Sequence, residues 1–156
     1  MKKTLFLLTV FLCTNLIGQN VPDWENPEIF AINKEDTRAT SIPYPSKNLA
    51  IEDIYSSSPY YQSLNGVWKF HWLPKLPEVP PDFYKENYDI SKWADMPVPG
   101  NWEFNGFGIP MYVNTGFGFP KNPPYIDRED SPVGAYRHSF NIPDSWDGRK
   151  VFIHFE

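Results

Sequence analysis

In this chain of 156 residues, residues 95–114 carry the side chains that are best suited to catalysis or ligand binding. The stretch contains two carboxylates, Asp95 and Glu103, among glycines, prolines and aromatic rings, and it lacks Cys, His, Ser and Lys. A glycosidase needs two carboxyl groups at a fixed separation, about 5–5.5 Å for retention and about 6.5–9.5 Å for inversion. No spacing among the acidic residues of this chain singles out such a pair. We therefore interpret Glu103 as a loop carboxylate and assign no catalytic residue.

The same region is better supplied for binding a sugar. Aromatic rings offer a face to the C–H surface of a pyranose, and amides both donate to and accept from its hydroxyl groups. The span contains both kinds of group: Asn101, Trp102, Tyr112, Asn114 and Asn122. The same residue types also form ordinary turns in Gly/Pro-rich segments, so composition leaves a sugar-binding loop and a plain turn both open. We expect Trp102 to pack in a core beside the loop rather than to stack on a ligand.

Metal and phosphate chemistry find little support in the sequence. His71, His138 and His154 lie far apart, each within a strand-like run, so we interpret them as residues at the margins of a β core and assign no metal site. The glycine pairs at 106–108 and 116–118 lack the Lys and Ser/Thr that follow in a phosphate loop. The net charge is −5 and no basic run is visible, so nucleic acid is not an expected partner.

Residues 1–18 are typical of a signal peptide. Lys2 and Lys3 precede an apolar run from Leu5 to Ile17, which is shorter than the roughly 20 apolar residues of a transmembrane helix. The sequence therefore predicts export, either to the periplasm or as a secreted protein. Lipid attachment at Cys13 is the less favoured alternative, because the residues before it are large. Cys13 is the single cysteine, so removal of residues 1–18 would exclude a disulfide framework.

The rest of the chain divides into an irregular arm and a β-rich domain. Residues 19–61 are broken by prolines and have few periodic apolar positions, which predicts an extended arm. The arm nevertheless contains Trp24, Ile29, Phe30 and Ile32, which are too apolar for a free tail. We expect these side chains to dock on the domain or on a partner.

Alternating apolar residues predict strands within residues 62–156. The clearest is LNGVWKFHWLP, in which Trp68, Phe70 and Trp72 fall on one face. Further strands are predicted at 109–114, 135–143 and 150–156, and a helical turn is expected at 80–82. Many strands with long loops predict an all-β fold, a β-sandwich or jelly roll. Because the last residues look like a strand, we expect the domain to be incomplete at its C-terminal end.

Several segments, taken in order, resemble one family. They are DWENPEIFAINKE (23–35), SLNGVWKFHW (63–72), VPGNWEFNGFGIPMYVN (98–114), NPPYI (122–126) and PVGAYRHSFNIPDSWDGRKVFIHFE (132–156). In combination they are similar to the N-terminal region of the large bacterial β-galactosidases of glycoside hydrolase family 2. The resemblance covers nearly all of the chain after residue 18.

This resemblance implies an N-terminal jelly-roll sugar-binding domain, of the galactose-binding type, followed by immunoglobulin-like domains and a catalytic TIM barrel. It implies a retaining hydrolase of terminal β-galactosides whose two catalytic glutamates, together with its magnesium and sodium sites, lie beyond Glu156. Within this chain it implies that Asn114 helps to hold the galactosyl unit and that Thr115 lines the same pocket. It also implies that the arm packs at a subunit interface of a homo-oligomer.

Two other functions remain open on the sequence alone. The chain could be a stand-alone carbohydrate-binding module of a secreted protein, or a sandwich with a purely structural role. The module would need a completed sandwich, whereas the enzyme would need a barrel with two suitably placed glutamates.

Overall fold

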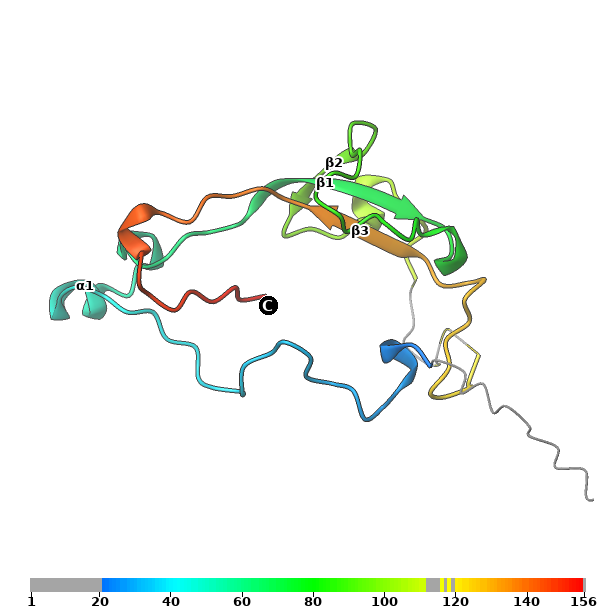
Figure 1. The fold of residues 1–156 in the computed structure, drawn as a ribbon, viewed down its shortest axis with the longest axis horizontal. Helices are drawn as coiled ribbons and strands as arrows, with labels where there is room; N and C mark the ends of the chain where they lie inside the picture. Colours follow the sequence, from blue (N-terminus) through cyan, green and yellow to red (C-terminus); the bar gives the residue numbers. More distant parts are fainter. Residues whose placement is uncertain (1–20, 112–115, 117, 119, 156) are drawn as a thin grey trace, which may run out of the picture.

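The computed structural model describes residues 21–111, 116, 118 and 120–155. At its centre is a three-stranded antiparallel sheet, in the order β2-β1-β3 (Figure 1). The strands are β1 (Gly66–Leu73), β2 (Ala94–Val98) and β3 (Val133–Arg137). The one α-helix among the described residues is α1 (Lys47–Glu52). Short 3-10 turns complete the structure: η1 (Asp23–Glu25), η2 (Tyr55–Ser57), η3 (Leu76–Glu78), η4 (Glu103–Asn105) and η5 (Asp144–Trp146).

The central strand confirms the alternation predicted for residues 64–74. Phe70 is 1% exposed, and the register places it opposite Ala94 of β2 and Tyr136 of β3. On the same face Trp68 lies opposite Met96, which is fully buried. Burial of large apolar side chains on one face is the main stabilising contribution that such a sheet can make. One part of the core is therefore this aromatic face of β1.

The opposite face of β1 carries the second part of the core. His71 stacks on the buried Trp93, with ring centroids 5.6 Å apart, and Leu73 and Ala135 are buried beside them. Arg137 extends from this face to the preceding loop, where it donates to the carbonyl oxygens of residues 83, 85, 86 and 88 at 2.6–3.5 Å. A guanidinium group can satisfy several acceptors at once because it has five donors. Arg137 thus ties residues 83–88 to the sheet.

Strand β2 lies in a region that the sequence had predicted to be loop, because prolines surround it. Pro97 sits within the strand, opposite Val67. The order β2-β1-β3 leaves β2 with only one neighbour, so it is an edge strand of this sheet. Proline is tolerated on an edge strand because its missing N–H is not needed there. The edge position explains why a segment this rich in turn formers is nevertheless a strand.

Three other predicted strands differ from the structure. Residues 109–111 are irregular, and the rest of that prediction lies outside the described residues. Strand β3 stops at Arg137 instead of reaching 143, and residues 150–155 form no strand. A strand requires a neighbour for its backbone groups, and no described segment pairs with these residues. Among the described residues, the fold is mostly β with one antiparallel sheet.

The helical turn that was expected at 80–82 is not a helix in the structure. Residues 80–85 form hydrogen-bonded turns instead.

The arm is partly ordered, which the sequence did not predict. Helix α1 begins after Ser46, whose hydroxyl accepts from the N–H of Leu49, as expected of an N-cap. The apolar residues predicted to dock are exposed in this chain: Trp24, Ile29, Phe30 and Ile32. These side chains do not pack on the described part of the domain, and the arm runs beside the sheet without covering it (Figure 1). Docking on a partner stays a prediction.

The predicted signal peptide, residues 1–18 with Cys13, lies outside the described residues. Within the described part of the chain, no helix is both long and apolar enough to span a membrane. The proposed boundary at 61/62 falls just before β1, between a 3-10 turn and the first strand.

Candidate functional site

Residues 99–111 form a loop that is fixed on the aromatic face of the sheet. The ring of Phe107 meets that of Phe70 edge-on at 4.9 Å, and the ring of Trp102 lies tilted against it at 6.0 Å. Gly134 of β3 makes this approach possible, since a Cβ there would come within 2.4 Å of the Trp102 ring. Trp102 is half-buried and packs against Phe70 of the core, as expected. The loop that leads to the predicted sugar-binding residues therefore starts from an aromatic anchor.

The polar groups of this loop are used to hold its own turns. The side-chain amide of Asn105 donates to the carbonyl of Asn101 at 2.8 Å, and Gly106, at φ 90°, ends the turn η4. A positive φ of this kind favours glycine. Glu103 lies in η4, and its charge adds to the burial that raises the pKa of the Tyr136 phenol. The interpretation of Glu103 as a loop carboxylate stays a prediction.

The two predicted substrate-binding residues, Asn114 and Thr115, lie outside the described residues, as does Tyr112. Asn122 is described, and its carbonyl accepts from the N–H of Tyr125 at 2.8 Å to close a turn. The side chain of Tyr125 is 54% exposed. The structure thus describes the chain up to residue 111 and from residue 120 onward, and the placement of Asn114 and Thr115 stays a prediction.

Sequence analysis missed an ion pair on the C-terminal side of this region. Glu25, in η1, is 5% exposed, and its two carboxylate oxygens accept from Nε and Nη2 of Arg128 at 3.2 and 2.8 Å. The hydrogen bond from Arg128 holds the pKa of Glu25 below its ordinary value despite burial, and a backbone hydrogen bond from Ile126 acts in the same direction. Any contribution of the pair to stability is present at neutral pH and is lost as the pH falls through that lowered pKa.

Glu25 belongs to the DWENP segment that helped to define the family resemblance, but neither its burial nor its partner could be read from the sequence. Arg128 is 103 residues away and lies in a stretch rich in turn formers. The only available signal was a charged residue among the apolar residues of the arm. Such a residue more often faces solvent.

Two of the three histidines contact the sheet, on opposite faces, whereas His154 lies in the segment 150–155, which forms no strand. His138 stacks on Trp68, with centroids 5.0 Å apart, and His71 stacks on Trp93 on the other face. Among the described residues, no group of three or more His, Cys, Asp or Glu side chains could hold a metal ion. His71 and His138 thus lie at the margins of the β core, as the sequence analysis interpreted them.

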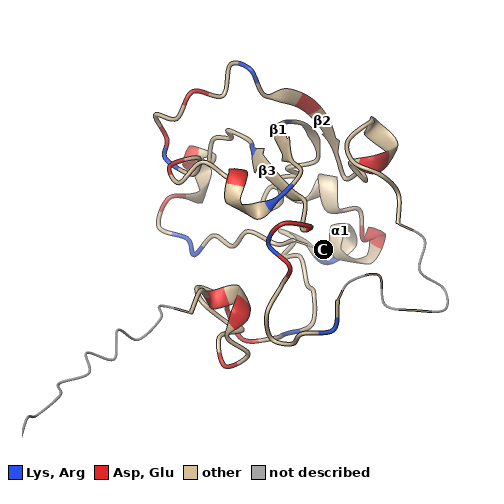
Figure 2. Cartoon of the chain, turned by 90° about the vertical axis from the view of Figure 1, so that its right-hand side faces the viewer, with Lys and Arg blue, Asp and Glu red and all other residues tan. Residues whose placement is uncertain are grey.

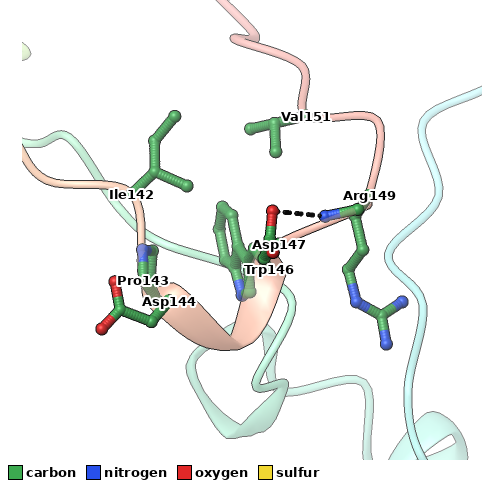
Figure 3. Close-up of a pocket in the computed structure, with 8 residues that line it drawn as sticks. Ile142, Pro143, Asp144, Trp146, Asp147, Arg149 and Val151 are labelled. Atoms are coloured by element: carbon green, nitrogen blue, oxygen red, sulfur yellow. Dashed lines mark hydrogen bonds between the residues drawn. The ribbon is translucent and has the colours of Figure 1, made fainter.

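A hollow of about 490 Å³ lies near the C-terminal end of the described chain, lined by Ile142, Trp146 and Val151 with several charged residues around them (Figure 3). A tryptophan beside carboxylates could in principle bind a sugar. The polar groups here are engaged locally: the indole N–H of Trp146 donates to the carbonyl of Pro59, and Asp147 accepts from the N–H of Gly148. Because the indole N–H and the Asp147 carboxylate are already used in these local hydrogen bonds, we assign no site to the hollow.

A second hollow of about 460 Å³ is lined by Tyr84, Arg137 and His138, and Arg137 is already committed to loop carbonyl groups. Lys and Arg residues are spread over separate segments of the described chain rather than gathered on one element (Figure 2). Neither the second hollow nor the distribution of basic residues indicates a site for an anionic ligand.

Comparison with known families assigns the domain. The family model described as "Glycosyl hydrolases family 2, sugar binding domain" matches residues 61–156, which include the whole sheet and its loops. The chain therefore belongs to glycosyl hydrolase family 2, and the matched residues correspond to its sugar-binding domain.

Curated relatives narrow the class further. The chain is 33% identical over 140 residues to a β-galactosidase of Priestia megaterium, an alignment that covers 86% of this chain and 14% of that protein. It is 36% identical over 124 residues to β-galactosidase 2 of Enterobacter cloacae (80% and 12%). It is 38% identical over 120 residues to a β-galactosidase of Vibrio cholerae (77% and 11%). The chain thus spans about an eighth of the length of these relatives.

Proposed function

We propose that this chain is the N-terminal part of a longer retaining β-galactosidase that hydrolyses terminal β-D-galactose residues. The observation that supports this most strongly is the similarity to curated β-galactosidases, which extends over most of this chain but only 11–14% of theirs. On this proposal the sheet described above belongs to a jelly-roll sandwich. Other parts of the longer protein supply its second sheet and the catalytic barrel.

The proposal assigns Asn114 and Thr115 to the galactosyl pocket. Two observations support the assignment: the family match covers both residues, and the loop before them is anchored on Phe70 through Trp102 and Phe107. An asparagine amide can donate to one sugar hydroxyl and accept from another. No catalytic role falls to this chain, and we expect the chain alone to be inactive because retaining chemistry requires two carboxyl groups.

Magnesium and sodium are implied by the resemblance for the whole enzyme, and the proposal assigns neither ion to this chain. Any such sites would belong to other parts of the longer protein. Export through residues 1–18 is also part of the proposal, supported by the sequence pattern alone.

The proposed partners are a β-galactoside, the other domains of the same enzyme, and further copies of the chain. Exposure of Trp24, Phe30 and Ile32 on the arm supports the last of these, because apolar side chains of this size gain from burial at an interface. The apparent mass of the longer protein with and without residues 19–35 would test the role of the arm in assembly.

The decisive experiment replaces Asn114 by Ala in the longer protein. Sugar hydroxyls left unpaired in a dry pocket cost about 1–3 kcal/mol each, so kcat/KM is expected to fall by about tenfold to a few hundredfold. The fold should be retained, as judged by circular dichroism. Glu103→Gln is the matched control and should leave turnover close to that of the wild type. The assignment is wrong if Glu103→Gln abolishes turnover while Asn114→Ala leaves kcat/KM within about twofold.

A further inference from the structure

One charged contact joins the arm to the segment that leads from the predicted sugar loop into β3. Glu25 in η1 and Arg128 form a bidentate pair, and the turn containing Glu25 lies beside the segment before β3 (Figure 1). Among the ion pairs of the described residues, this one alone includes a carboxylate side chain that is less than a tenth exposed, at 6%. Paired hydrogen bonds of this kind fix direction as well as distance.

The same segment is fastened to the end of β1. The carbonyl of Arg128 accepts from the N–H of Leu76 at 3.1 Å, and Lys75 pairs with Glu129 at 2.8 Å. Residues 126–129 therefore contact the arm on one side and the chain just after β1 on the other. Without Glu25, the contacts from Lys75 and Leu76 would remain, but the Arg128 side chain would have no carboxylate to orient it.

We infer that Glu25 and Arg128 are positioning residues, through which the N-terminal arm fixes the C-terminal anchor of the sugar loop. The inference rests on the proposed function. The N-terminal anchor is the contact of Trp102 and Phe107 with Phe70. Without the pair, the C-terminal anchor is held only by the contacts from Lys75 and Leu76, so residues 126–129 are restrained on one side instead of two. A less restrained segment loses more conformational freedom when a ligand binds. The arm thus helps to position the sugar loop, in addition to its proposed role at an interface between copies of the chain.

The experiment compares Glu25→Gln and Arg128→Gln with a matched control, Glu35→Gln. Glu35 is also an arm carboxylate with a basic partner, Lys150 at 2.8 Å, but its side chain is 58% exposed. The first readout is amide hydrogen exchange of residues 120–131 in the longer protein. We expect exchange to rise roughly tenfold in both test variants and to stay unchanged in the control. Arg128→Lys keeps the charge but not the two-point geometry, and should give an intermediate rise.

The second readout is kinetic. A misplaced loop should weaken sugar binding, so KM for a chromogenic β-galactoside should rise about tenfold, with kcat affected less because the proposed carboxylates are elsewhere. A merely structural role would lower the amount of folded enzyme without moving KM. If Arg128→Gln does not fold, Glu25→Gln and Arg128→Lys provide the same comparison.

The two readouts together test the anchoring role of the pair and its link to the sugar site. Faster exchange together with a raised KM supports the inference. Unchanged exchange in the test variants overturns it, and faster exchange with an unchanged KM overturns the link to the sugar site. If the wild-type protein hydrolyses no β-galactoside although exchange rises, the proposed function fails and the anchoring role of the pair stands.

Discussion

The sheet and the arm of this chain are both rich in large apolar side chains but use them in opposite ways. Phe70 at the centre of β1 is 1% exposed, whereas Phe30 in the arm is 80% exposed. The sheet is held by ring contacts between β1 and β3 and between β1 and the loop at 99–111, and by the burial of Met96 of β2. The arm is held by the pairs Glu25–Arg128 and Glu35–Lys150 and by the hydrogen bond from Ser58 to the carbonyl of Pro43. Apolar residues thus stabilise this chain only where a neighbouring strand is present to bury them.

The largest expected effect comes from comparing the same substitution in the two regions. Phe70→Ala should lower the free energy of unfolding by about 3–5 kcal/mol, because it leaves a cavity among Trp102, Phe107 and Tyr136. Phe30→Ala should change it by less than about 0.5 kcal/mol. Urea unfolding followed by tryptophan fluorescence measures both. A loss at Phe30 comparable to that at Phe70 would show that the arm is buried in solution and would remove the contrast.

The difference between the regions also explains what the sequence could predict. The alternation in β1 was readable from the sequence because both of its neighbouring strands lie within this chain. Tyr136 and His138 both contact Trp68 on the aromatic face. Strand β2 was missed because its status as an edge strand, which allows Pro97, depends on the order of strands in space. Residues 150–155 carry the same alternation but form no strand. Alternation predicts which side chains share a face, but it does not predict whether a neighbouring strand is present.

The candidate site shows the same limit. The packing of Trp102 beside the loop was expected from the sequence. Its contact with Gly134 could not be predicted, because it depends on the register of β3. The Glu25–Arg128 pair joins residues 103 positions apart, so no local pattern could reveal it. Long-range charged pairs depend on which loops meet, and that follows from the fold rather than from local sequence.

A smaller difference in stability is expected between alanine substitutions at two glycines, Gly134 and Gly116. A Cβ at Gly134 would meet Trp102 at 2.4 Å and Phe70 at 2.7 Å, and both atoms belong to rings that are held by packing. Gly134→Ala should therefore destabilise the sheet by about 1–3 kcal/mol through overpacking. Gly116→Ala is the control, since open space surrounds that position. The midpoints of thermal unfolding should fall for the first variant only. Equal midpoints would mean that the loop bearing Trp102 moves away easily, which would weaken the case for an aromatic anchor.

The smallest effect is expected at the surface of the sheet itself. Lys69 of β1 and Asp95 of β2 face each other across the strands at 2.7 Å, but their side chains are 41% and 63% exposed. Exposed pairs contribute about 0.2–1 kcal/mol and are screened by salt. Asp95→Asn should thus lower the free energy of unfolding by no more than that, and the difference from the wild type should shrink at about 1 M salt. Asp95 is also one of the two carboxylates beside the predicted sugar loop. A loss of β-galactoside turnover in Asp95→Asn, with stability unchanged, would give this residue a chemical role that its pairing with Lys69 does not suggest.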